Sequence, residues 1–305
     1  MKQSVKTILV LVLLFLGASS LALVRQVPLK MLPFDNKNEL QLMVDLPEGT
    51  SLERTEALCA ELMAYLRGVP EVTDFTAYVG HSSPMDFNGM VRRTYLRRAP
   101  HLADLRLNLL PKKERVLQSH ALALALRPEL EAIAQRHPGA LVKIVEAPAG
   151  PPVIATITVE VFGGPFTTHA ELAAGARVLA DRLAVEPGVV EVDVMVEEPQ
   201  ERLLFAPDRE RAALSGVSVQ AIAETVAAAF GGLDAAHLHR TGEVNAIPVR
   251  LRLPLPARSA EADLARVRVP AAGGALVPLL ELGKLERQTV EPTRYHKNMR
   301  PVVYV

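Results

Sequence analysis

The sequence has few of the residues on which several classes of site depend. Among its 305 residues there is one cysteine, Cys59, and no tryptophan, and aromatic side chains make up 4%. One thiol excludes an intramolecular disulfide framework and any zinc or iron–sulfur site that needs several thiolates. So few aromatic rings make a poor stacking platform for single-stranded nucleic acid, and we expect no nucleic-acid partner.

The chain also lacks an excess of charge and any catalytic motif. Lysine plus arginine total 34, as do aspartate plus glutamate, so no net field directs the chain to nucleic acid or anionic lipid. It contains no G-x-S-x-G, H-E-x-x-H or G-x-x-x-x-G-K-[ST] motif. His169 and Glu171 match the H-x-E of zinc deaminases, but the P-C-x-x-C partner is absent. We therefore expect no enzyme, no bound metal and no cofactor.

What the sequence does have is enough apolar residues for a sizeable core. Apolar residues make up 49% of the chain and charged residues 22%, a balance that argues against disorder. The length is sufficient for about two domains.

One long apolar run lies near the N-terminus. Residues 7–24 are 18 consecutive residues without a charge, preceded by Lys2 and Lys6. A helix of that length spans about 27 Å, close to the hydrocarbon core of a bilayer. A secretory signal cleaved near Ser20-Leu21-Ala22 is the alternative. We predict an uncleaved transmembrane helix with its lysines in the cytoplasm and the rest of the chain exported.

Two segments about 115 residues apart share one plan. In the first, residues 39–46 alternate as a half-buried strand does. Thr50 and Glu53 form a T-x-x-E pattern, which predicts a capping box at the start of a helix that runs to Gly68. A second strand is predicted at residues 72–79.

The second copy repeats this order. Residues 156–162 alternate, Thr168 and Glu171 again give T-x-x-E, and Pro187-Gly188 ends the helix. Residues 189–196 alternate once more, which predicts a strand. Two strand–helix–strand units of matching length indicate an internal repeat.

The first copy continues with further elements. Residues 95–110 contain an alternating strand, residues 119–136 a helix that Pro128 should kink or restart, and residues 141–145 a strand. The resulting order β-α-β-β-α-β is the ferredoxin-like arrangement.

The second copy instead diverges after its first unit. Residues 200–291 read as a different α+β module, with a helical stretch at 208–230 broken at Gly216 and short strands after it. Residues 300–305 have strand character, and the second unit lacks its closing elements, so the chain looks truncated.

Several motifs, in order, resemble one protein family. They are Leu32-Pro33-Phe34-Asp35, Leu46-Pro47-Glu48-Gly49-Thr50, the segment AALSGVS at 212–218 with Gly231-Gly232, and Pro292-Thr293-Arg294-Tyr295-His296-Lys297-Asn298. The chain resembles the second half of the permease of resistance-nodulation-division (RND) efflux transporters, from the seventh transmembrane helix through most of the second periplasmic loop. The resemblance covers essentially all 305 residues.

The resemblance implies an α+β fold with an N-terminal transmembrane helix, ferredoxin-like porter subdomains and an inserted α+β docking subdomain. The helix and link would be residues 1–33, and the first porter subdomain residues 34–154. An incomplete second porter subdomain would be residues 155–196 and 292–305, and docking residues 197–291.

The resemblance also implies a function, partners and a location. Family permeases are trimers in the bacterial inner membrane that export drugs or other small molecules by proton antiport, with a periplasmic adaptor and an outer-membrane channel. The proton-carrying residues lie in helices that this chain lacks. The alternatives are a stand-alone, membrane-anchored periplasmic binding or assembly module, and a non-functional gene remnant.

The loop at residues 80–90 is the first candidate site, because the family places a switch loop there beside the substrate pocket. Tyr78, Met85, Phe87 and Met90 offer polarisable or aromatic groups suited to apolar ligands. The alternative is that this loop only packs its Met and Phe against the subdomain. Met43, with Met85 and Met90, could also make a thioether site for Cu(I) or Ag(I), but packing is the favoured interpretation.

Two further groups of residues attract attention. His237 and His239 alternate on a possible strand, where the family has a docking hairpin. We predict an interface role for them, with a solvated hairpin as the alternative and metal binding not favoured. Arg92, Arg93, Arg97 and Arg98 predict a solvated strand face, with pairing to acidic residues as the alternative.

Overall fold

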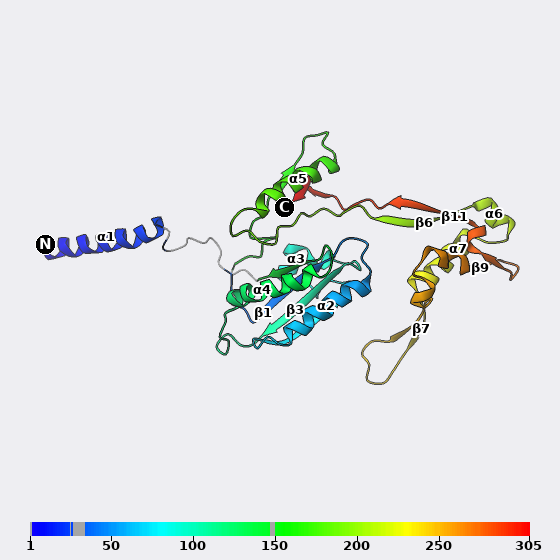
Figure 1. Cartoon of the computed structure of the whole chain (residues 1–305), viewed down its shortest axis with the longest axis horizontal. Helices are drawn as coiled ribbons and strands as arrows, with labels where there is room; N and C mark the ends of the chain where they lie inside the picture. Colours follow the sequence, from blue (N-terminus) through cyan, green and yellow to red (C-terminus); the bar gives the residue numbers. More distant parts are fainter. Residues whose placement is uncertain (1, 25, 27–33, 147–149) are drawn as a thin grey trace. The chain divides into compact units, whose positions relative to one another are not determined.

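The computed structural model describes residues 2–24, 26, 34–146 and 150–305 (Figure 1). The chain forms two compact units, one of Met1–Glu198 with Pro292–Val305 and one of Pro199–Glu291. Residues 25 and 27–33 of the link before residue 34, including Leu32 and Pro33 of the first motif, lie outside the described residues.

The N-terminal helix, α1, runs over Lys2–Leu23. Nine consecutive apolar side chains, from Ile8 to Leu16, are each 49–69% exposed. Among the described residues, no helix combines the length and apolar character that crossing a membrane requires. The predicted membrane span therefore stays a prediction.

The first lobe is a four-stranded antiparallel sheet with two helices on one face. Its strands are β1 (Glu39–Asp45), β2 (Val72–Val79), β3 (Leu102–Leu109) and β4 (Leu141–Val145), in the order β2-β3-β1-β4. The helices α2 (Leu52–Leu66) and α4 (Ser119–Gln135) lie across this sheet (Figure 1). This strand order confirms the predicted ferredoxin-like arrangement.

The core of this lobe follows from the alternation in its strands. Leu42 on β1 and Leu105 and Leu107 on β3 are fully buried, because every second residue of a strand points to the same face. They pack against the leucines of α2 and α4 that recur at helical spacing. Each buried leucine contributes about 1.5–3 kcal/mol relative to an exposed one.

Two local predictions for the first lobe need correction. Thr50 does not cap α2, since its hydroxyl donates to the Pro47 carbonyl (2.6 Å) in the preceding turn. Ser51 takes the N-cap position without a side-chain cap bond, so the first capping box is wrong. Of the two effects predicted for Pro128, a kink or a restart, the restart is wrong, because α4 continues through it, and the kink stays a prediction.

The second lobe has a three-stranded sheet in the order β12-β13-β5. Its elements are β5 (Glu160–Phe162), α5 (His169–Ala184), β12 (Tyr295–Lys297) and β13 (Arg300–Tyr304). The predicted Thr168–Glu171 capping box is confirmed: Thr168 Oγ1 accepts from Glu171 N (3.3 Å), and Glu171 accepts from Thr168 N (2.8 Å). The two lobes therefore have separate sheets.

The strand predicted at residues 189–196 does not form. Glu191 adopts a left-handed backbone with a φ of 55°, which interrupts an extended chain. Met195 N still donates to the Tyr304 carbonyl (2.9 Å), and Val194 and Val196 pack on the core of the second lobe. The apolar alternation thus accompanies only partial burial here, since Val190 in the same pattern is 55% exposed, and no regular strand forms.

The second unit is built from short elements. They are β6 (Glu201–Pro207), α6 (Arg209–Leu214), α7 (Val219–Val226), a π-helix (Ala227–Gly231), β7 (Leu233–Leu238), β8 (Ile247–Leu251), β9 (Arg268–Pro270), β10 (Leu276–Pro278) and β11 (Gly283–Thr289). The helical stretch breaks at Gly216, as predicted, where φ is 66°. Val269, Leu279 and Leu282 are fully buried in the core of the second unit.

Candidate functional site

The face of the first sheet that α2 and α4 leave free is covered by the chain between β2 and β3. This covering segment (residues 80–98) contains a loop, the helix α3 (Phe87–Arg92) and a 3-10 turn (Thr94–Leu96). Its polar groups contact the side chains that alternate away from the leucine core on β1 and β3.

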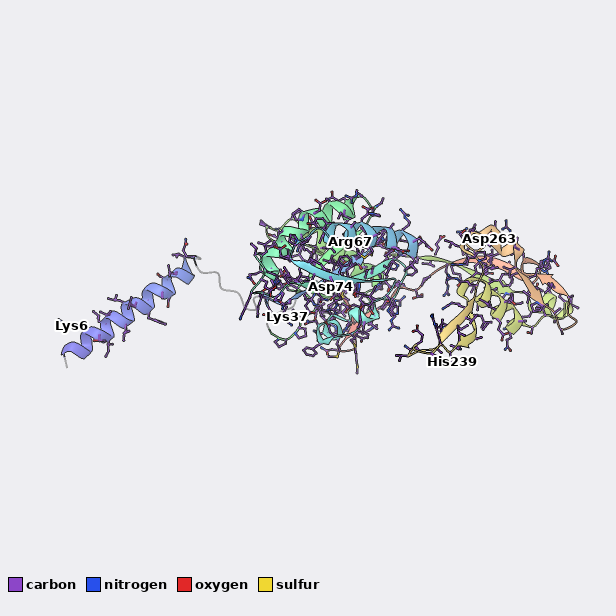
Figure 2. The ribbon with its side chains drawn as sticks, turned by 90° about the horizontal axis from the view of Figure 1, so that it is seen from below. Lys6, Lys37, Arg67, Asp74, His239 and Asp263 are labelled. Carbon is purple, nitrogen blue, oxygen red and sulfur yellow. The ribbon has the colours of Figure 1, made fainter. Side chains whose placement is uncertain are left out.

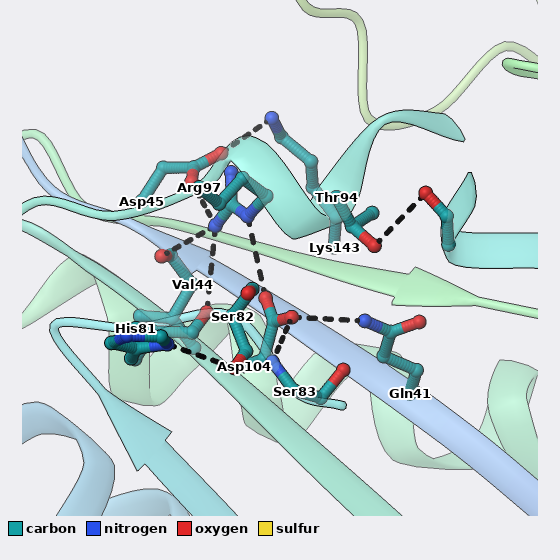
Figure 3. Close-up of polar contacts among 12 residues, drawn as sticks. Gln41, Val44, Asp45, His81, Ser82, Ser83, Thr94, Arg97, Asp104 and Lys143 are labelled. Carbon is teal, nitrogen blue, oxygen red and sulfur yellow. Dashed lines mark hydrogen bonds and ion pairs between the residues drawn. The ribbon is translucent and has the colours of Figure 1, made fainter. Parts of the chain in front are cut away.

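Asp104 on β3 is the centre of these contacts (Figure 3). It is fully buried and accepts hydrogen bonds from Gln41 Nε2 (3.2 Å), Ser83 N (3.0 Å) and Arg97 Nε (3.3 Å). A buried carboxylate needs such partners, because leaving it unpaired in an apolar interior is strongly unfavourable. Asp104 therefore fixes the start and the end of the covering segment to the sheet.

Arg97 extends this network to a second aspartate. Its Nη2 lies 2.6 Å from Asp45 Oδ1 and donates to the Val44 carbonyl (3.1 Å). The prediction that this arginine belongs to a solvated strand face is wrong, since the segment folds into α3 and a turn over the sheet. Its alternative, pairing with acidic residues, is what the structure shows for Arg97.

Lys143 on β4 completes the network, with its Nζ 2.6 Å from Asp45 Oδ2. Burial would raise the pKa of Asp45, but Lys143 and Arg97 outweigh it and hold that pKa below its ordinary value. Burial would likewise lower the pKa of Lys143, and Asp45 and Asp193 raise it instead. The charged forms are therefore favoured in the folded state.

Arg106, two residues beyond Asp104 on the same strand, holds the loop itself. Its Nε donates to Ser83 Oγ (3.1 Å), and its Nη2 lies 2.8 Å from Asp86 Oδ2. Asp86 also caps α3, because its Oδ1 accepts from Gly89 N (2.5 Å). Burial raises the pKa of Asp86, but the Gly89 amide and Arg106 together lower it below its ordinary value.

Two glycines let the segment approach so closely. Gly80 has a φ of +74°, and a Cβ there would lie 2.6 Å from Leu52 Cδ1. A Cβ on Gly89 would lie 2.8 Å from Thr94 Oγ1. Both positions therefore favour glycine.

The predicted contact residues fall on this segment and beside it. Met85, Phe87 and Met90 are 63%, 64% and 47% exposed, and Phe87 and Met90 are three residues apart on α3, hence on one helix face. Tyr78 is half-buried on β2, opposite Asp104 in the sheet register. The structure brings three of the four residues into one surface segment, and their contact with a ligand stays a prediction.

Next to α3 lies a shallow pocket that sequence reasoning missed. Its volume is about 290 Å³ including its open mouth, and it is lined by Glu39, Leu40, Gln41, Asn88, Arg106, Val145 and Glu146. Glu146 is buried and lies 2.9 Å from His120 Nδ1. The available signal was the alternation of β3, which places charged side chains on the face opposite its leucines.

Met43 lies on the same face of β1, half-buried between Asp104 and Lys143 in the register. This position fits the packing role favoured for it. Among the described residues, no group of three or more His, Cys, Asp or Glu side chains is placed to hold a metal ion.

The histidines of the second unit lie on an exposed hairpin. Both strands, β7 and β8, are exposed along their length, and His237 faces Pro248 across the ladder. His239 lies past the end of β7 (Figure 2), so the two histidines do not share one regular strand. Their interface role stays a prediction.

The chain was compared with protein families, with curated proteins and with solved structures. The model of the AcrB/AcrD/AcrF family matches residues 1–305. Two crystal structures of a heavy metal efflux pump, in crystal forms II and I, match 90% of the chain with a TM-score of 0.62 and 20% identity. The chain covers 27% and 28% of those chains, respectively. No curated protein matches the sequence.

Proposed function

The chain belongs to the AcrB/AcrD/AcrF family of RND efflux permeases, and from this premise we propose that it forms the substrate-handling part of an efflux pump. Members of this family are transporters, so the chain groups with transport proteins and not with enzymes. It spans about a quarter of the length of the structures it matches (27%). The activity, substrates and partners of a whole pump are therefore part of the proposal.

We assign the porter and docking parts along the chain as the family resemblance implies. The first porter subdomain is residues 34–154, the second is residues 155–196 with 292–305, and docking is residues 197–291. Two observations support this division: the lobes have separate sheets, and Pro199–Glu291 forms its own compact unit. The substrate cleft would lie between the two porter subdomains.

The observation that carries the proposal is the anchored but apolar surface at residues 85–90. Met85, Phe87 and Met90 remain 47–64% exposed, although Arg106 and Asp86 fix the backbone beneath them. Large apolar groups held in solvent mark a binding surface when they are contiguous. Thioether and aromatic side chains adapt to apolar ligands of varied shape.

A membrane anchor for the chain is the second part of the proposal. Residues 7–24 carry no charge, and the described apolar side chains of α1 are exposed, as they are in a helix that lipid surrounds. The helix would hold the chain in the bacterial inner membrane with its bulk in the periplasm. We also propose, from the family resemblance, trimer formation, proton antiport, and binding to an adaptor and an outer-membrane channel. The hairpin of His237 and His239 would be a docking element.

The test is Phe87→Ala in the full-length pump that contains this chain, with Phe166→Ala as the control. Phe166 is 96% exposed in the second lobe, outside the covering segment. We expect Phe87→Ala to change resistance to some compounds at unchanged protein abundance, and Phe166→Ala to leave resistance unaltered. An unchanged profile for both variants over a broad compound panel would contradict the proposal and favour a stand-alone module.

A further inference from the structure

A short crossing segment, residues 189–198, follows α5 and contacts the first lobe through charged side chains. Glu191 Oε1 accepts a hydrogen bond from Ile144 N on β4 (2.9 Å) and forms an ion pair with Arg127 Nη1 of α4. Asp193 forms an ion pair with Lys143 Nζ on β4. Both acidic groups come from the second lobe, and all three of their partners belong to the first.

Glu191 acts as a cap on an open sheet edge. The strand β4 is the outermost strand of the first sheet and pairs with β1 alone among the described strands. The amide of Ile144 faces the edge, where the Glu191 carboxylate takes the place that a carbonyl of a neighbouring strand would occupy. A single side chain provides this bond, so it can be broken without unzipping a ladder.

Both basic partners have a second acidic neighbour within their own lobe. Lys143 Nζ lies 2.6 Å from Asp45 Oδ2, and Arg127 Nη1 lies 3.9 Å from Glu131 Oε1, one helical turn along α4. Breaking a buried ion pair is costly chiefly because a charge is left unpaired. Here neither cation is left unpaired when the crossing segment moves away.

The two carboxylates of the contact are also partly accessible to water. The Asp193 side chain is 43% exposed and that of Glu191 is 19% exposed, so water can solvate both carboxylates as they leave. The left-handed φ of 55° at Glu191 is unusual for a non-glycine residue. This backbone conformation occurs at the residue whose side chain makes the contact with Arg127 and Ile144.

We propose that Glu191 and Asp193 form a releasable ionic latch between the two lobes. On opening, Lys143 stays with Asp45, Arg127 turns to Glu131, and the Ile144 amide becomes accessible to water. The role of the latch in a transport cycle rests on the proposed function, whereas the opening itself is a property of this chain.

Another contact between the lobes differs in kind. The Arg93 guanidinium of the first lobe lies 5.7 Å from the ring centroid of Tyr295 in the second lobe. This contact does not pair one charged side chain with an oppositely charged one. It can stay in place while the latch is open.

The experiment measures the distance between the lobes in the whole chain, in detergent, by pulsed electron spin resonance. Nitroxide labels are placed through Leu124→Cys on α4 and Val178→Cys on α5, both exposed positions. The native Cys59 is fully buried and stays unlabelled. The latch variant is Glu191→Gln with Asp193→Asn. The control is Glu186→Gln, just after α5, which removes an exposed ion pair with Arg182 on α5.

We expect a narrow distance distribution for the unaltered latch and for the control at low salt. The latch variant should add a second, longer distance population, and high salt should produce that population without the substitutions. Identical distributions for the latch variant and the control would overturn the proposal.

A third variant tests whether Arg127 changes its partner from Glu191 to Glu131 when the latch opens. Glu131→Gln removes the second partner of Arg127 at an exposed position and should reduce the fraction of long distances at high salt. If Glu131→Gln leaves this fraction unchanged, partner exchange at Arg127 is wrong. These distances are measured without substrate, so normal opening combined with an unaltered resistance profile for Phe87→Ala would refute the proposed function and leave the latch standing.

Discussion

Arg106 on β3 and Asp86 at the start of α3 form an ion pair in which Nη2 and Oδ2 lie 2.8 Å apart. The same guanidinium donates to Ser83 Oγ, three residues before Asp86. One side chain of the sheet thus holds the loop at two points, and Asp86 passes this constraint to α3 through its bond with Gly89 N. Arg106 therefore helps to position α3, the helix that carries the exposed Phe87 and Met90.

Arg106→Gln should therefore loosen the covering segment without unfolding the first lobe. The pair is partly exposed, so its loss should cost about 1 kcal/mol or less. We expect amide hydrogen exchange at Gly89 to accelerate several-fold, while amides of β1 and β3 keep their protection. Arg98→Gln, at an exposed position of the same segment, is the control, and equal acceleration in both variants would contradict the role given to Arg106.

Acid should destabilise the first lobe through Asp45. Its pKa is lowered in the folded state from an ordinary value of 3.8, so the ionised carboxylate stabilises the fold above that value. This stability is lost as the pH falls through the lowered pKa. Urea unfolding followed by circular dichroism should show the decline below about pH 4, the ordinary aspartate range.

Asp45→Asn provides the comparison for this pH profile. At neutral pH the substitution should lower the free energy of unfolding by about 1–3 kcal/mol. The loss stays in this range because Lys143 and Arg97 keep Asp193 and Asp104 as partners. The variant should also lose less stability than the unaltered chain on acidification. An unchanged acid profile would show that other carboxylates dominate the transition.

The sequence predicted the first sheet well because its information is local. Alternating leucines on β1 and β3 and the helical spacing on α2 each report burial within one element. The same pattern failed at residues 189–196, where Val194 and Val196 are partly buried but Glu191 has a left-handed backbone and its side chain bonds Ile144 N. Alternation indicates which side chains tend to face a core, and it does not record the backbone bonds that define a strand.

The candidate site shows the same limit. The resemblance located Met85, Phe87 and Met90, which the structure leaves exposed. It did not reveal Arg106 or the pairing of Arg97 with Asp45, since those partners lie 20 and 52 residues apart in the sequence. In the sequence, charged residues that alternate with leucines on a strand are compatible with a solvent-exposed face. Only the topology shows that another segment of the chain covers that face.

The lone thiol, Cys59, should be inert in the folded chain. It is fully buried on α2, and this burial together with Glu56 raises its pKa to about 12. Because the thiolate is the reactive form, we expect no labelling by iodoacetamide at pH 8 until urea unfolds the first lobe. Val178→Cys, exposed on α5, should label at once, and rapid labelling of Cys59 without urea would contradict the packing of α2.

The N-cap residues of α5 and α2, Thr168 and Ser51, should respond differently to mutation. Thr168→Ala removes a hydroxyl that accepts from Glu171 N and should cost about 1 kcal/mol of stability. Ser51→Ala, at the N-cap of α2, removes no side-chain cap bond and should change stability by less than about 0.5 kcal/mol. Thermal unfolding followed by circular dichroism measures both. Equal losses would mean that Ser51 caps α2 in solution, and that the turn bond of Thr50 to Pro47 does not exclude a cap at the adjacent residue.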